Sequence, residues 1–157
     1  MDIGVAKTQE YKQGMSLQEA NDYIYSFDLT PVIRRLIDTE CWSEKHARAA
    51  AEQYRNFLYL MKKYGREHQL TPSYEIDEAW HAHILHTKKY VAFCEKVFGK
   101  YLHHYPHLVQ EGGDTESLNN RFKRTQLLHK EEFGDFIYQI KRQPIRLKQL
   151  FKKPAFK

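Results

Sequence analysis

A chain of 157 residues, of which 41% are hydrophobic and 14% aromatic, is long enough for one domain with a substantial buried core. Two cysteines exclude the disulfide framework of a small secreted domain, and no apolar run approaches the roughly eighteen residues of a membrane span. The first residues contain no apolar stretch typical of a secretion signal, so we expect a cytoplasmic protein. Few glycines and prolines, among many helix-forming residues, predict an all-α fold.

The first half of the chain predicts three helices. Residues 1–15 are polar and unpatterned, and we expect them to form a flexible arm. A capping box between Ser16 and Glu19 begins a short helix that reaches about residue 27. A Thr-Pro pair begins a second helix, to about residue 40. Ser43 caps the third and longest helix, which should cover residues 44–64.

The second half predicts three further helices and a loop. Ser73 is expected to cap a helix that covers about residues 74–85. Thr87 is expected to cap the next helix, which Gly99 should end. Residues 101–107, rich in tyrosine and histidine, predict an ordered aromatic loop, and a sixth helix should run from about residue 115 toward residue 133. We therefore expect one compact bundle of about six to seven short-to-medium helices over residues 16–140.

The apolar positions predict which helices pack together. Ile76, Trp80 and Ile84 follow one stripe of the helix near residues 74–85. We expect Trp80 to be buried against the third helix, near Phe57 and Met61.

The sequence lacks the motifs that are typical of several enzyme classes. The chain has no GxSxG elbow, Walker loop, GxGxxG fingerprint or HExxH pattern. Cys41 and Cys94 each fall in an apolar pattern that is typical of a buried thiol, and neither has the CxxC spacing that lowers a thiol pKa. Any chemistry must therefore depend on the histidines.

Five of the nine histidines lie between residues 72 and 106. Asp77 and His81 are four residues apart, so both side chains can reach one metal ion from the same face of a helix. His83 lies about 200° around the helix from His81, and it forms a second possible pair with His86, three residues on. A regular helix offers two ligands at once. The third ligand must then come from the aromatic loop, where His103 and His104 are the candidates.

A longer pattern of residues resembles a known family. It consists of DxxWHxHIL from residue 77, TxxY from residue 87, Cys94, Phe98-Gly99 and HHxP from residue 103. With these residues the chain resembles the glycine-rich domain-containing protein-like family, and in particular its bacterial members, over about residues 45–107. The resemblance singles out a set of metal-capable residues, and it implies no settled activity. The set is Asp77, His81, His83 and His104.

Two functional interpretations remain open at this point. Imidazole and carboxylate ligands suit Zn²⁺ or Fe²⁺, and they permit metal-assisted hydrolysis or iron-dependent oxidation. Alternatively, Asp77 hydrogen-bonds His81, Trp80 fills the core and the other imidazoles fasten the aromatic loop. The protein would then be a non-enzymatic interaction module without a metal.

The positive charge of the chain is concentrated at its end. Residues 141–157 contain seven Lys or Arg and no acid, so the other 140 residues carry −2 of the overall +5. We expect the tail to cover the domain with its apolar residues; the alternative is an amphipathic helix that contacts an acidic protein, nucleic acid or a membrane surface. The candidate partner-binding residues are Arg146, Lys148, Lys152 and Lys153.

Overall fold

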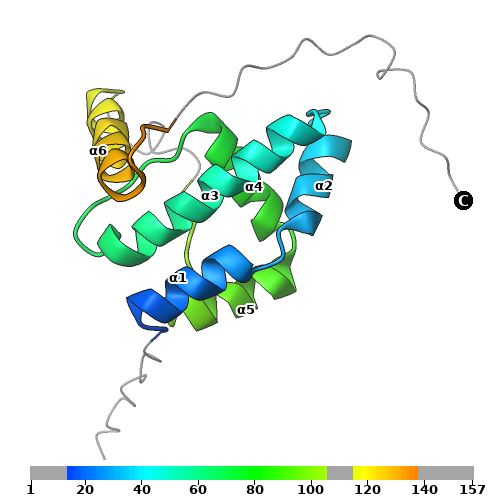
Figure 1. Cartoon of the computed structure of the whole chain (residues 1–157), viewed down its shortest axis with the longest axis horizontal. Helices are drawn as coiled ribbons and strands as arrows, with labels where there is room; N and C mark the ends of the chain where they lie inside the picture. The colour runs from blue at the N-terminus through cyan, green and yellow to red at the C-terminus, as the bar shows by residue number, and fades with distance from the viewer. Residues whose placement is uncertain (1–13, 106–114, 138–157) are drawn as a thin grey trace, which may run out of the picture.

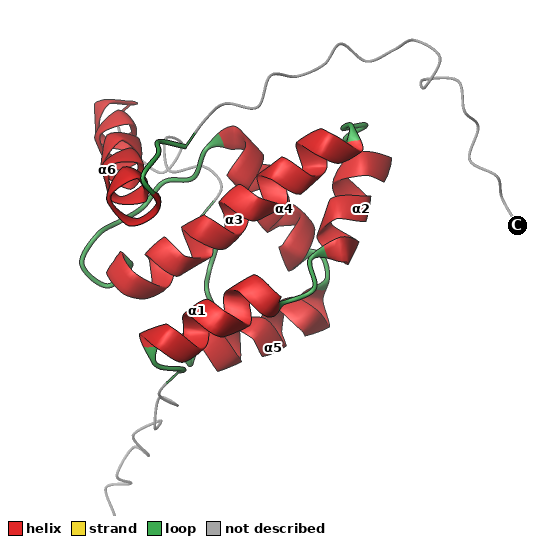
Figure 2. Cartoon of the chain, viewed as in Figure 1, coloured by secondary structure: helices red, strands yellow, loops and turns green. Residues whose placement is uncertain are grey.

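The computed structural model describes residues 14–105 and 115–137, and over these residues it confirms the predicted all-α fold. Six helices and no strand occur in the described part of the chain (Figures 1 and 2). The helices are α1 (Leu17–Ser26), α2 (Thr30–Asp38), α3 (Glu44–Tyr64), α4 (Tyr74–Ile84), α5 (Thr87–Phe98) and α6 (Thr115–Phe133). None of them has the length and apolarity needed to cross a membrane.

Serine side chains cap three of the helices where the sequence predicts it. The Ser16 hydroxyl accepts the Glu19 amide at 3.3 Å, and the Glu19 carboxylate accepts the Ser16 amide at 2.9 Å, which confirms the capping box. The hydroxyls of Ser43 and Ser73 each accept the third amide of α3 and α4. These bonds satisfy amides that have no partner within the helix, so they fix where each helix begins.

The junction between α4 and α5 corrects one prediction. Thr87 is the first residue of α5 and not its N-cap; His86 takes the N-cap position, without a capping bond from its side chain. The His86 amide still donates to the His83 carbonyl at 3.0 Å, and the His86 carbonyl accepts the Tyr90 amide at 3.0 Å. The chain therefore passes almost directly from one helix to the next. Gly99 ends α5 as predicted, in the left-handed region at φ 71°.

Helix α3 is the central element of the fold. It crosses the molecule and packs against α1, α2, α4 and α6 (Figure 1). One face of α3 is apolar along its length, with short alanines in the first half and larger side chains in the second. Such a continuous stripe lets one helix contribute to most of the core. The buried apolar residues of α3 are Ala47, Ala50, Ala51, Tyr54, Phe57, Leu58 and Leu60.

The structure confirms two predictions about burial and corrects a third. Trp80 is only 5% exposed, and its ring centroid lies 5.6 Å from that of Phe57 on α3. Cys94 is also buried, as predicted. The expectation of a buried Cys41 is wrong: this residue is exposed and has φ 54°, in the turn between α2 and α3. A turn with a left-handed residue interrupts the helical period from which burial was inferred.

Helix α6 is attached to α3 largely by polar contacts. The Glu132 carboxylate accepts hydrogen bonds from Tyr59, Lys63 and Tyr64 of α3. About one turn earlier in α6, the buried His129 hydrogen-bonds the Asn56 side chain at 3.1 Å. These bonds hold α6 against the second half of α3.

Some sequence predictions fall wholly or partly outside the described residues. At the amino-terminal side, the structure begins with residues 14 and 15, and the Met15 amide donates to the Lys96 carbonyl at 3.0 Å. Residues 1–13 of the predicted arm lie outside the described residues. The same is true of residues 106–114 and of the basic tail with Arg146, Lys148, Lys152 and Lys153.

Candidate metal centre

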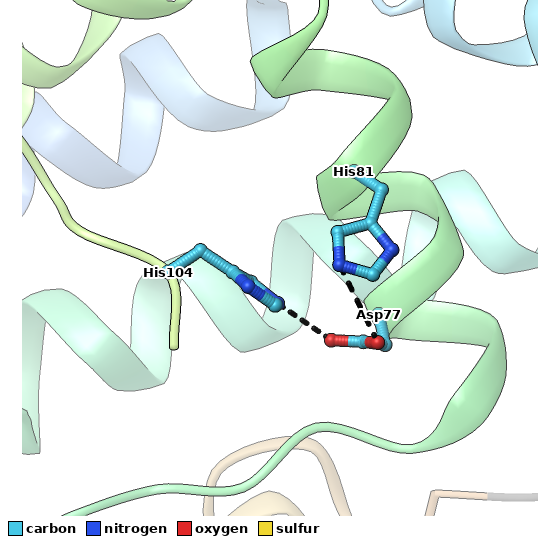
Figure 3. Close-up of side chains that lie close together, drawn as sticks. All are labelled: Asp77, His81 and His104. Atoms are coloured by element: carbon cyan, nitrogen blue, oxygen red, sulfur yellow. Dashed lines mark hydrogen bonds and ion pairs between the residues drawn. The ribbon is translucent and has the colours of Figure 1, made fainter. Parts of the chain in front are cut away.

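Three predicted ligand residues come together between α4 and the loop that follows α5 (Figure 3). Asp77 and His81 lie one helical turn apart on α4, and His104 approaches them from the loop. His104 Nε2 donates to Asp77 Oδ1 at 2.6 Å, while His81 Nε2 lies 3.7 Å from Asp77 Oδ2. One ligand atom from each residue lies within 4.8 Å of the others. The structure thus groups two imidazoles and one carboxylate.

The loop is held in place by a buried tyrosine. The Tyr90 hydroxyl accepts the indole N–H of Trp80 at 2.8 Å and donates to the Leu102 carbonyl at 2.6 Å. Two residues further along the loop, the His104 ring packs edge-on against Trp80, with 4.4 Å between the ring centroids. Because Tyr90 is itself fully buried, these bonds fix the loop against α4 and present His104 to Asp77.

Both ring nitrogens of His81 face carboxylates. While Nε2 is directed toward Asp77, Nδ1 lies 3.8 Å from Glu78 Oε1. Burial raises the pKa of the Glu78 carboxyl, and nearby Glu40 raises it further. A carboxylate at the second nitrogen of a histidine ligand is a common way to orient the ring toward a metal. Sequence reasoning missed Glu78, although its spacing of three residues from His81 on a helix was a usable signal.

His83 lies away from this group. Its side chain is buried among aromatic rings, and its Nδ1 shares a hydrogen bond of 3.0 Å with the Tyr54 hydroxyl. Burial, with a smaller effect of neighbouring His86, lowers the pKa of His83 from 6.5 to about 4. Its Nε2 has no hydrogen-bond partner within the described ranges. His83 is therefore placed as a neutral residue of the core.

The two additional candidates also lie outside the group. His86 occupies the N-cap position of α5. Its Nε2 is buried and has no hydrogen-bond partner in the part of the chain that the structure describes. His103 is exposed and packs against the Tyr101 ring, with 4.8 Å between centroids. The loop therefore offers His104, and not its neighbour, to the Asp77 side of α4.

The donor set fits a small divalent transition metal. Bonds of about 2.0–2.2 Å from nitrogen and oxygen place the ligand atoms of a tetrahedral zinc site about 3.3 Å apart. His81 Nε2 lies 3.7 Å from Asp77 Oδ2 and His104 Nε2 lies 2.6 Å from Asp77 Oδ1, and one ligand atom from each residue lies within 4.8 Å of the others. Binding would replace the hydrogen bond between Asp77 and His104, because a ring nitrogen must be deprotonated to become a metal ligand. Three protein ligands leave at least one position open, as in catalytic rather than structural zinc sites.

The described residues form an all-α fold with a two-histidine, one-carboxylate cluster on one helix and one loop. Residues 19–152 match the model of the UCP032817-like family, and the chain belongs to that family.

The curated relatives confirm the resemblance to glycine-rich domain-containing proteins. Glycine-rich domain-containing protein 1 of Arabidopsis thaliana is 35% identical over 89 residues, which is 54% of this chain and 11% of the relative. Glycine-rich domain-containing protein 2 of the same plant is 27% identical over 132 residues, which is 82% of this chain and 15% of the relative. The chain thus matches a small part of much longer proteins. No solved structure matches it.

Proposed function

We propose that this chain is a metal-binding helical module in which Asp77, His81 and His104 hold one divalent ion, Zn²⁺ or Fe²⁺. The observation that carries the proposal is the convergence of one ligand atom from each residue to within 4.8 Å, from two separate segments of the fold. Two imidazoles with a carboxylate are the ligands of some zinc hydrolases and of non-haem iron oxygenases. The free thiols of Cys41 and Cys94 agree with the expected cytoplasmic location.

The open coordination suggests a catalytic rather than a purely structural ion. When bound, zinc would supply Lewis-acid chemistry for hydrolysis, and iron would supply redox chemistry for oxidation. The chain's own residues would have distinct tasks. Asp77 would neutralise part of the ion's charge, Glu78 would orient His81, and the bonds of Tyr90 would hold the loop that carries His104.

Metal analysis of the untagged protein tests the proposal. We expect the purified wild type to contain, or to take up, about one zinc or iron ion per chain, and chelation by EDTA to lower its melting temperature. Asp77→Asn and His81→Gln should each lose the ion. His103→Gln is the matched control, because His103 lies beside His104 but outside the ligand group; it should retain the ion. Circular dichroism shows that each variant is folded.

One result would overturn the proposal. If wild-type protein that has never met a chelator is metal-free and binds neither Zn²⁺ nor Fe²⁺ on titration, then the bond between His104 and Asp77 only fastens the loop. The interaction module without a metal would then explain the site.

A further inference from the structure

A pocket of about 940 Å³ lies beside the candidate metal centre. Its walls come from the connection between α3 and α4, from the loop after α5 and from α6. Asp77 and His104 form part of its lining, so a molecule in the pocket reaches two of the three candidate ligands. The volume is in the range of pockets that enclose small organic molecules.

Much of the pocket wall is apolar or aromatic. Trp80 from α4 forms part of this wall, together with large side chains from α3, from the connection between α3 and α4, from the loop after α5 and from α6. Aromatic faces of this kind favour a flat, apolar body in the ligand. The main apolar and aromatic residues of the wall are Met61, Leu70, Tyr74, Trp80, Leu102 and Leu118.

The charges on the wall favour an anion. Lys100 and Arg121 both line the pocket, and neither forms an ion pair with a carboxylate in residues 14–105 or 115–137. Among the described lining residues the single carboxylate is Asp77, which already accepts a hydrogen bond from His104. Within the described residues the pocket therefore has two cations without a carboxylate partner, and an arginine can bind a carboxylate with two parallel hydrogen bonds.

We infer that this pocket binds a small organic carboxylate with an apolar, aromatic body, and that Arg121 and Lys100 recognise the carboxylate. This binding site goes beyond the proposed metal centre, because it depends on residues that are not metal ligands. The apolar body would lie against Trp80, and the carboxylate would lie toward α6 and the loop.

Naphthoate and its uncharged amide, naphthamide, separate charge recognition from apolar contact. The protein has two tryptophans, Trp80 on the pocket wall and Trp42 outside it, so their indole N–H signals in nuclear magnetic resonance provide a reporter and an internal control. We expect naphthoate to shift the Trp80 signal saturably and to leave that of Trp42 unchanged. Naphthamide should bind at least about tenfold more weakly, because it lacks the charge-assisted bonds.

Variants of the two cations test their roles. Arg121→Gln and Lys100→Gln should each weaken naphthoate binding several-fold, and together more than about tenfold. Lys123→Gln, which removes an exposed charge from α6 outside the pocket, is the matched control and should have no effect. Arg121→Lys keeps the positive charge and should retain more affinity than Arg121→Gln. This difference would show that the weaker binding of Arg121→Gln comes from the lost charge and not from misfolding.

Titrations with metal-free and zinc-loaded protein distinguish this inference from the proposed function. Naphthoate binding to metal-free protein would support the pocket even if no ion binds at Asp77. Equal affinity for naphthoate and naphthamide, or no shift of the Trp80 signal with either protein form, would overturn the inference while leaving the metal proposal intact.

Discussion

At the scale of single residues, Glu78 offers a test of how His81 is held. Its carboxylate lies 3.8 Å from His81 Nδ1, whereas Asp77 lies near the other ring nitrogen, Nε2. Glu78→Gln should therefore weaken zinc binding by about ten- to a hundredfold without removing a ligand. Competition with a fluorescent chelator measures the affinity, and Glu95→Gln on the exposed side of α5 is the control. An unchanged affinity would mean that Glu78 does not support the site.

The buried His83 predicts how the stability of the protein depends on pH. The unfolded chain takes up a proton near pH 6.5, whereas the folded protein resists protonation of this residue until about pH 4. Since the unfolded state binds more protons in this window, the free energy of unfolding should be highest above pH 6.5 and should fall as the pH decreases toward 4. The loss due to His83 should be on the order of 3 kcal/mol.

Urea unfolding at several pH values measures this dependence. His83→Gln should flatten the slope between about pH 6.5 and pH 4, because the variant has no imidazole to protonate at this position. His68→Gln, on the pocket wall and outside the core, should retain the wild-type slope. If both variants keep the same slope as the wild type, His83 is not the residue that resists protonation.

Part of the candidate site was accessible from the sequence. The period of the helix pairs Asp77 with His81, and the same period already places His83 on another face. The choice of His104 over His103 was suggested by the resemblance alone, since it depends on how Tyr90 holds the loop. That arrangement is a tertiary contact between residues that are not neighbours in the chain, and no local pattern reports it.

At the scale of secondary-structure elements, Tyr90 connects α4, α5 and the loop. Tyr90→Phe would leave both the Trp80 indole N–H and the Leu102 carbonyl without their partner. An unsatisfied buried polar group costs about 1–3 kcal/mol, so we expect a stability loss on the order of 2 kcal/mol. Zinc affinity should fall as well, because the loop that presents His104 becomes less fixed.

Chemical denaturation and zinc titration of the same variants check both effects. Tyr101→Phe is the control, since the Tyr101 side chain is exposed. Trp80→Phe removes the indole donor but keeps an aromatic ring, so its loss should overlap with that of Tyr90→Phe in a double-mutant cycle. Fully additive losses would show that the two side chains do not act through their mutual hydrogen bond.

Element boundaries were predicted well where a side chain marks them. Ser16, Ser43 and Ser73 each mark the start of a helix, because a serine hydroxyl at the N-cap accepts a hydrogen bond from an amide that has no partner within the helix. At Thr87 the same reasoning failed, because α5 begins one residue earlier than predicted and His86 takes the N-cap position without a capping bond from its side chain. The exposure of Cys41 could not be inferred either, because its left-handed backbone conformation lies outside the helical period from which burial was predicted.

At the scale of the whole molecule, the packing of the basic tail is a prediction from the sequence, because the tail lies outside the described residues. The family match extends to residue 152 and so includes most of the tail. Apolar residues also alternate with the basic ones there, which favours packing of the first half against the domain. The apolar residues are Ile145, Leu147, Leu150 and Phe151.

Deleting residues 143–157 should therefore lower the melting temperature by several degrees, as the loss of 1 kcal/mol or more does in a domain of this size. A matched variant separates apolar from charged contributions: it has glutamine at positions 146, 148, 152 and 153, and it keeps the apolar residues. We expect its melting temperature to stay close to that of the wild type. The opposite result would be an unchanged melting temperature after deletion, with RNA binding that needs the four charges. Steep weakening of that binding by salt would assign the tail to an anionic partner, because each neutralised phosphate releases a counterion.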